Sequence, residues 1–148
     1  MDRVQKAVDL FKSGCNCSQS VICAYCDLFG LDTHDAMRVS ESFGGGMGRM
    51  RLTCGAVSGM FMLVGLKYSQ GVPKDLATRT KVYGIVQDLA QKFKNKHGSI
   101  ICSELLGVNL PKDTGATPTE RTPEFYKKRP CLKCIEDCAR LVEENLID

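Results

Sequence analysis

The longest apolar stretch of the chain runs from Leu52 to Leu66 and contains no charged residue. As a helix it would be roughly 23 Å long at about 1.5 Å per residue, whereas about 20 residues are needed to span a bilayer. We therefore expect a helix buried inside a globular protein, with Cys54 in its first turn. Interior glycines cost about 1 kcal/mol each in helix propensity. The small residues Gly55, Ser58 and Gly59 thus predict close approach by neighbouring helices.

Apolar positions recur with helical spacing on both sides of this stretch, whereas no strand pattern or internal repeat stands out. Glycines, prolines and residues with N-cap side chains mark where the helices should begin and end. The first expected helix ends at Ser13-Gly14. Besides the central helix, five more are expected: from Asn16 or Ser18 to Gly30, from Asp32 or Thr33 to Ser42, from Pro73 to Gly98, from Ser99 (with Ser99 or Ser103 as the cap) to Gly107, and from Pro130 to Leu146.

The fold class that follows is all-α. We expect a single-domain helical bundle of about five to seven helices around the buried, Gly/Met-rich central helix, covering residues 1–148. The segment from Val108 to Thr122 is rich in Pro, Thr, Gly and Asp and predicts an irregular surface loop. After it, Phe125 and Tyr126 are expected to pack back onto the core.

A glycine cluster precedes the central helix, and two arginines, Arg49 and Arg51, follow the cluster. The pattern GGGMG is similar to a phosphate loop, but no strand precedes it and no Gly-Lys-Ser/Thr ends it. We interpret it as a tight turn that needs positive φ and close approach. It is also the expected cofactor-binding segment, supplying N–H donors and access to a site. The residues assigned to that role are Gly44, Gly45, Gly46, Gly48 and Arg49.

Composition and charge exclude some classes of partner. The chain has 148 residues, 43% of them hydrophobic and 25% charged, and a net charge of +3, which is ordinary for one soluble domain. No basic stripe with interleaved aromatic residues appears, so we expect no nucleic-acid partner. The apolar run is too short for a membrane span. The oligomeric state stays open, a homodimer included.

Nine cysteines are the unusual feature of the composition. The N-terminal sequence MDRVQKAVDLFKSG lacks the apolar core of a secretory signal, so we expect a cytoplasmic protein whose thiols stay reduced. Cysteines in such a chain serve as metal ligands, as redox thiols or as small buried apolar residues. The nine are Cys15, Cys17, Cys23, Cys26, Cys54, Cys102, Cys131, Cys134 and Cys138.

Three further candidates for metal binding have simpler interpretations. Cys23 and Cys26 form a CxxC spacing within one predicted helix, and core packing is the favoured interpretation of that pair. His34 is expected at the surface. His97 lies at the C-terminal end of a long helix, where positive charge is favourable. No Ser-His-Asp or His-Glu motif appears, so a general acid–base hydrolase is poorly supported.

Four cysteines, Cys17, Cys54, Cys102 and Cys131, fall at or near predicted helix N-termini. A helix start carries roughly half a positive charge and free N–H donors, and both favour thiolate over thiol. Arg49 and Arg51 before Cys54, and the basic run before Cys131, act in the same direction. Four helices could thus direct their sulfur atoms at one point, where an anionic iron–sulfur cluster would suit the helix starts.

Five motifs occur along the chain in a recognisable order: NCSQSV at Asn16–Val21, FGGGMG at Phe43–Gly48, TCGAVSG at Thr53–Gly59, GSIICSELLG at Gly98–Gly107, and a late Cys131. Together they resemble, over about residues 3 to 145, the redox-active protein family named for its C, GCAxxG, C, C pattern.

The resemblance implies redox activity and a set of site residues, but no substrate. The family's four characteristic cysteines correspond to Cys17, Cys54, Cys102 and Cys131, and its genes often neighbour oxidoreductase or transporter genes. This chain departs from the pattern by five further cysteines. Of these, Cys134, which lies a turn away from Cys131, is the expected substitute or accessory ligand.

The sequence leaves three functions open. The first is an iron–sulfur or other metal-binding redox protein that exchanges electrons with a partner oxidoreductase. The second is a thiol–disulfide oxidoreductase in which Cys54, activated by Arg49, attacks and another of the four cysteines resolves. The third is a zinc- or small-molecule-binding helical protein without redox turnover, although ligands spread over four helices do not resemble zinc knuckles. The catalytic and the metal-ligand assignments both fall on Cys17, Cys54, Cys102 and Cys131.

Overall fold

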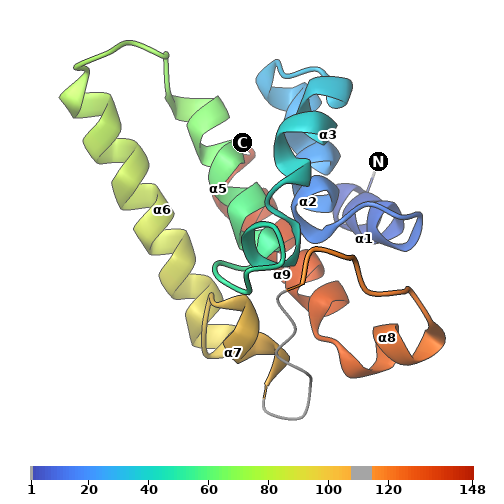
Figure 1. Cartoon of the computed structure of the whole chain (residues 1–148). Helices are drawn as coiled ribbons and strands as arrows, with labels where there is room; N and C mark the ends of the chain where they lie inside the picture. Colours follow the sequence, from blue (N-terminus) through green and yellow to red (C-terminus); the bar gives the residue numbers. More distant parts are fainter. Residues whose placement is uncertain (1, 108–114) are drawn as a thin grey trace.

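Helix α5 (Gly55–Tyr68) lies at the centre of the protein and packs mainly against three other helices (Figure 1). These are α2 (Cys17–Tyr25), α9 (Cys131–Leu146) and the long α6 (Leu76–His97), which lies along one side of the molecule. The computed structural model describes residues 2–107 and 115–148. The remaining elements are α1 (Arg3–Lys12), which packs on α2 and α9, η1 (Cys26–Phe29), α3 (Thr33–Glu41), α4 (Gly44–Met47), α7 (Cys102–Leu106) and α8 (Pro123–Lys128).

The arrangement confirms an all-α fold. Within the described ranges, six helices have seven or more residues and there is no strand. One isolated antiparallel bridge joins Thr53 to Ile101. The core is a continuous cluster of apolar side chains from α1, α2, α5, α6 and α9. Among the described helices, none is long and apolar enough to cross a membrane.

Local sequence signals set several helix ends where we expect them. The Asn16 side chain accepts the Gln19 N–H at 3.0 Å, and the Gln19 side chain accepts the Asn16 N–H at 2.9 Å, which makes a reciprocal cap for α2. Asp32 caps α3. Gly98 ends α6 with φ of 87°, a conformation that favours glycine.

The predicted start of the central helix is wrong by three residues. α5 begins at Gly55 because the backbone before it pairs with the segment before α7. The Cys102 N–H donates to the Leu52 carbonyl at 2.6 Å, and the Cys54 N–H donates to the Ile100 carbonyl at 2.8 Å. Cys54 is therefore the N-cap of α5 and does not belong to its first turn.

Three other boundaries also differ from the predictions. Asp75 caps α6, so Pro73 lies before the helix and outside its first turn. Ile101 is the N-cap of α7, in place of either predicted serine. α2 ends at Tyr25, and Cys26 begins η1, so the CxxC spacing spans two elements.

The predicted loop from Val108 to Thr122 falls in part outside the described residues, at 108–114. Residues 115–122 contain no helix. The expected packing of Phe125 and Tyr126 is confirmed: their ring centroids lie 6.2 and 6.0 Å from that of Phe11 on α1.

Two glycines of α5 allow α2 to approach it closely, as the sequence predicts. A Cβ at position 55 would lie 3.1 Å from the Cys17 Cβ and 3.2 Å from the Ser18 backbone nitrogen. A Cβ at position 59 would lie 2.8 Å from the Ser18 carbonyl oxygen. Gly65, by contrast, faces open space. Close packing therefore explains Gly55 and Gly59 and does not explain Gly65.

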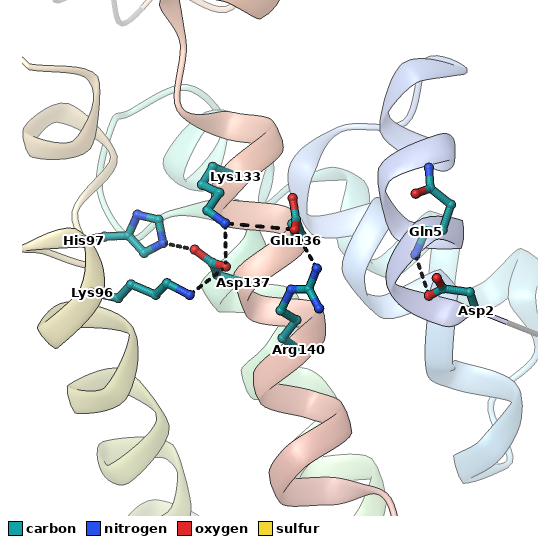
Figure 2. A network of polar contacts seen from close by, with 8 residues as sticks. All are labelled: Asp2, Gln5, Lys96, His97, Lys133, Glu136, Asp137 and Arg140. Atoms are coloured by element: carbon teal, nitrogen blue, oxygen red, sulfur yellow. Dashed lines mark hydrogen bonds and ion pairs between the residues drawn. The ribbon is translucent and has the colours of Figure 1, made fainter.

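A buried carboxylate joins α6 to α9 (Figure 2). Asp137 is 3% exposed and accepts hydrogen bonds from His97 Nε2 at 2.7 Å and Lys96 Nζ at 3.2 Å. Lys133 adds an ion pair at 3.4 Å. Burial opposes ionisation of Asp137, but Lys96, His97 and Lys133 outweigh it and lower the pKa of the carboxyl group. The position of His97 is therefore explained by Asp137 as well as by the end of its helix.

We expect Gly59→Ala to lower the free energy of unfolding by about 1–3 kcal/mol, because the added methyl group meets backbone that cannot move aside. The matched control is Gly65→Ala in the same helix, which should raise the free energy of unfolding by about 0.5–1 kcal/mol. Urea unfolding monitored by circular dichroism measures both. Equal effects at the two positions would contradict the close α2–α5 contact.

We expect Asp137→Asn to cost about 1–3 kcal/mol of stability at pH 7, since it leaves the largely buried His97 ring and two partly exposed lysines without their anionic partner. The folded-state pKa of Asp137 is lowered, so its contribution is present above about pH 4 and is lost as pH falls further. The difference between wild type and variant should therefore shrink in acid. The exposed control Asp88→Asn should change stability by less than about 0.5 kcal/mol, and an equal loss in both variants would refute this account.

Candidate functional site

Four cysteines stand at the starts of four helices, as the sequence predicts. Cys17, Cys102 and Cys131 are the first residues of α2, α7 and α9, and Cys54 is the N-cap of α5. Each sulfur therefore lies beside the partial positive charge of a helix N-terminus.

These four helix starts line one cavity of about 560 Å³. The glycine cluster and Arg49 form part of the same wall, so the structure brings all the predicted site residues together. The cavity also holds side chains that the four-cysteine pattern does not include: Cys134, Arg51, Arg121, Arg129 and Phe125.

Gly46 fixes the approach of the glycine cluster to α7. Its φ is 74°, and a Cβ there would lie 2.6 Å from the Cys102 Cβ and 2.9 Å from the Arg51 Cα. Any larger residue at position 46 would displace Cys102 and Arg51 from the glycine cluster. The tight turn with positive φ and close approach is thus confirmed.

Backbone carbonyls of the glycine segment accept N–H groups of the residues that follow it. The Arg49 N–H donates to the Gly44 carbonyl at 3.1 Å, and the Leu52 N–H donates to the Gly46 carbonyl at 2.9 Å. The Arg51 N–H donates to the Gly45 carbonyl at 3.3 Å. The segment therefore shapes the cavity wall, and its assignment as a cofactor-binding segment stays a prediction.

Cys17 and Cys131 form a partly exposed thiol pair, which we call the outer pair. Hydrogen bonding from the Cys17 thiol lowers the pKa of Cys131 against the effect of burial. Arg129, Arg121 and Arg51 act in the same direction, and together these groups bring the pKa to about 7. The same hydrogen bond, together with burial, raises the pKa of Cys17 well above its usual value. Cys131 is therefore the thiolate of the outer pair and Cys17 the protonated partner.

Cys54 and Cys134 form a second, buried thiol pair, which we call the inner pair. Their side chains are 7% and 1% exposed. Hydrogen bonding from Cys134 lowers the pKa of Cys54, and the backbone N–H groups of Val57 and Ala56 at the start of α5 act in the same direction. That bond and burial raise the pKa of Cys134. Each pair thus combines one cysteine that favours thiolate with one that keeps its proton.

Cys102 stands apart from both pairs. The Arg51 Nη1 donates to its sulfur at 3.8 Å. Burial nevertheless raises the pKa of Cys102, because it outweighs the attraction of Arg51. Cys102 is therefore a neutral thiol beside a cation.

Aromatic rings and backbone carbonyls hold two of the cavity arginines in place. Arg121 donates to the carbonyls of Phe11 at 2.7 Å and Cys15 at 2.8 Å, and its guanidinium lies 3.9 Å from the centre of the Phe11 ring. Arg129 lies 4.9 Å from the centre of the Phe125 ring. Burial lowers the pKa of Arg129, as do the neighbouring positive charges of Arg51 and Arg49. The cavity wall is thus strongly cationic.

Four cysteines and both histidines lie outside the cavity lining. Cys23, Cys26 and Cys138 are at most 2% exposed and belong to the apolar core, which confirms core packing for the CxxC spacing. Burial raises the pKa of Cys23 to about 12, so it stays a thiol. His34 is exposed, as predicted. All nine cysteines are free thiols in this structure.

Sequence reasoning named Cys134 only as an accessory residue and missed Arg121 altogether. The helical spacing of Cys131 and Cys134 was the available signal for the first, because it places both on one face of α9. Arg121 comes from an irregular segment without periodicity, and only the folded chain shows that it reaches back to α1.

The cavity cysteines are not grouped as the ligands of a metal ion. Among residues 2–107 and 115–148, no three histidine, cysteine, aspartate or glutamate side chains are grouped so that they could hold a metal ion. The cavity cysteines are arranged as two pairs and Cys102, and this arrangement does not fit a metal centre as it stands. The assignment of Cys17, Cys54, Cys102 and Cys131 as metal ligands stays a prediction.

Comparison with known proteins identifies the family. The family model described as "Putative redox-active protein (C_GCAxxG_C_C)" matches residues 15–145, and the chain therefore belongs to this family, as its motifs indicate. No curated protein and no solved structure matches the chain. The family description names no cofactor, substrate or partner.

We expect Cys131 to react with iodoacetamide with a half-maximal rate near pH 7, rising with pH, because its pKa is about 7 and only the thiolate is nucleophilic. Cys17→Ala removes the hydrogen bond and should move the midpoint upward, toward the value of about 8.5 for a free cysteine. Peptide mass spectrometry separates Cys131 from the other cysteines. Cys26→Ala, in the core, is the control and should leave the midpoint near 7. A wild-type midpoint near 9 would show that the outer pair does not activate Cys131.

Proposed function

We propose that this member of the C_GCAxxG_C_C family is a thiol–disulfide redox protein in which Cys131 attacks and Cys17 resolves. The observation that carries the proposal is that Cys17 and Cys131 both line a cavity large enough for a small molecule and shift each other's pKa in opposite directions. We expect such a pair to close into a disulfide. The arginines around the cavity support the thiolate form of Cys131.

The reaction transfers two electrons. The Cys131 thiolate attacks one sulfur of a substrate disulfide, forms a mixed disulfide and releases the other half of the substrate as a thiolate. The released thiolate takes up the proton of Cys17. Cys17 then attacks the Cys131 sulfur, which forms the Cys17–Cys131 disulfide and releases the second substrate thiolate. The outer pair is oxidised and the substrate disulfide is reduced.

The lowered pKa of Cys131 gives a moderate kinetic advantage. At pH 7 about half of Cys131 is thiolate, against about 1% for a thiol of pKa 9. Nucleophilicity falls with pKa, with a Brønsted slope of about 0.4–0.5, so the net gain is roughly sixfold. The larger contribution comes from position, since the resolving thiol and the attacking one belong to the same cavity wall.

The sequence favours Cys54 as the attacking residue, whereas we assign that role to Cys131. Cys54 is only 7% exposed, and Cys131 is partly exposed at the same cavity. An incoming disulfide would reach the outer pair first. We therefore place Cys54 and Cys134 behind it as a second dithiol that can exchange with the outer pair.

A metal or iron–sulfur centre that exchanges electrons with a partner oxidoreductase is the second candidate. It is supported by the four helix starts that present cysteine sulfurs to one cavity. Since the described side chains do not form a ligand group as placed, binding would require the sulfurs to move toward one another. A zinc site without redox turnover would require the same movement.

The test oxidises anaerobically purified protein with 2-hydroxyethyl disulfide, followed by peptide mapping without reduction. We expect a Cys17–Cys131 link and the release of two thiols for each link formed. Cys131→Ser should abolish the rapid oxidation by 2-hydroxyethyl disulfide, whereas the core control Cys26→Ala should retain it.

Metal analysis of the same preparation separates the candidates. Stoichiometric iron and acid-labile sulfide, with thiols that do not react, would contradict the thiol–disulfide proposal and favour a cluster. Stoichiometric zinc with unreactive thiols would favour the third function. A protein with neither metal and a rapid Cys17–Cys131 oxidation supports the proposal.

A further inference from the structure

The charges that line the cavity are strongly unequal. Among the described residues of the lining, four are arginines and one is acidic, Glu41, which is exposed. The arginines are Arg49, Arg51, Arg121 and Arg129. They come from the segment after the glycine cluster and from the segments on either side of α8, so three separate parts of the chain place cations at one site.

The two best-anchored arginines are held by uncharged groups. Arg121 donates to two backbone carbonyls and lies over the Phe11 ring. Arg129 donates to the Thr119 hydroxyl at 3.4 Å and lies over the Phe125 ring. Neither forms an ion pair with a carboxylate in the described part of the chain. Carbonyls and rings fix the orientation of a guanidinium without neutralising its positive charge, which here also acts on Cys131.

The size and the walls of the cavity point to a small molecule. About 560 Å³ lies within the range of small-molecule sites, and the rings of Phe11 and Phe125 give an apolar wall beside the cations. Arginine guanidinium groups bind carboxylates with two parallel hydrogen bonds, which lysine cannot reproduce.

We propose that the cavity selects small disulfides and thiols that carry carboxylate groups. This inference rests on the proposed thiol–disulfide function and names its substrate class. Arg129 and Arg121 bind the carboxylates, and this places the substrate sulfur against Cys131, the residue that both arginines adjoin. A substrate without negative charge reacts with the same cysteines but gains no such placement.

The test compares three aliphatic disulfides of similar size and different charge. These are 3,3′-dithiodipropionate, which is dianionic, 2-hydroxyethyl disulfide, which is neutral, and cystamine, which is dicationic. The rate of oxidation of the outer pair is followed by acid quenching and mass spectrometry, and each rate is divided by that of the same disulfide with dithiothreitol. We expect the dianion to react at least about fivefold faster than the neutral compound, with cystamine the slowest.

Two variants and one control locate the effect. Arg129→Gln should reduce the preference for the dianion to near one, and Arg129→Lys should retain part of it. Arg38→Gln, on the exposed face of α3 and outside the cavity lining, should leave the preference unchanged. Since a variant can fail to fold, the wild-type protein is also measured with added salt, where 0.5 M NaCl should weaken the preference.

The outcomes separate this inference from the proposed function. If none of the three disulfides oxidises the outer pair, the thiol–disulfide function itself fails. If all three react at equal normalised rates, or cystamine reacts fastest, the function stands and the selection of anionic substrates is refuted. A preference that Arg38→Gln removes as fully as Arg129→Gln also refutes it, because the effect would then come from net charge alone.

Discussion

The contact between α2 and α5 is the constraint on which the site depends. At Gly55 the backbone of α5 comes so close to α2 that a methyl group would touch Cys17 and Ser18, and at Gly59 the approach is closer still. Glycine disfavours helix formation, so the chain loses about 1 kcal/mol at each position in local propensity and recovers it through packing. Because Cys17 and Cys54 begin these two helices, the contact brings their sulfurs together. α9 packs on both helices and adds Cys131 and Cys134.

The cysteines of this protein differ in chemistry because their neighbours differ. Burial is the main cause that raises the pKa of Cys138, Cys15 and Cys23, which behave as small apolar residues or inert thiols. Burial acts on Cys131 as well, but there a thiol donor and three arginines reverse its effect. The sequence alone cannot distinguish these cases, since residue type and helical position are similar. The difference arises from contacts between segments far apart in the chain.

Much of the fold follows from the sequence, because its signals are local. Asn16, Asp32 and Gly98 set helix ends through their own conformational preferences, and the four helix-start cysteines follow from those ends. The start of α5 cannot be predicted in this way. Leu52 is apolar and Thr53 is β-branched, and such residues suit either a helix or the isolated bridge that Thr53 forms with Ile101. The division of the cavity cysteines into pairs, and the approach of Arg121 to α1, depend on tertiary packing that no periodicity reports.

The backbone between the glycine cluster and α5 has an unusual conformation. Met47, Arg49 and Arg51 have φ values of 65°, 61° and 61°, in the left-handed region where a side chain costs about 1–2 kcal/mol. Asparagine or glycine would relieve that strain, yet arginine occupies two of the three positions and faces the cavity. The loop thus gives up folding free energy for the placement of cations. Sequences selected for thermal stability alone would be expected to replace these arginines first, and such a protein would be more stable but would lose two of the arginines that line the described part of the cavity.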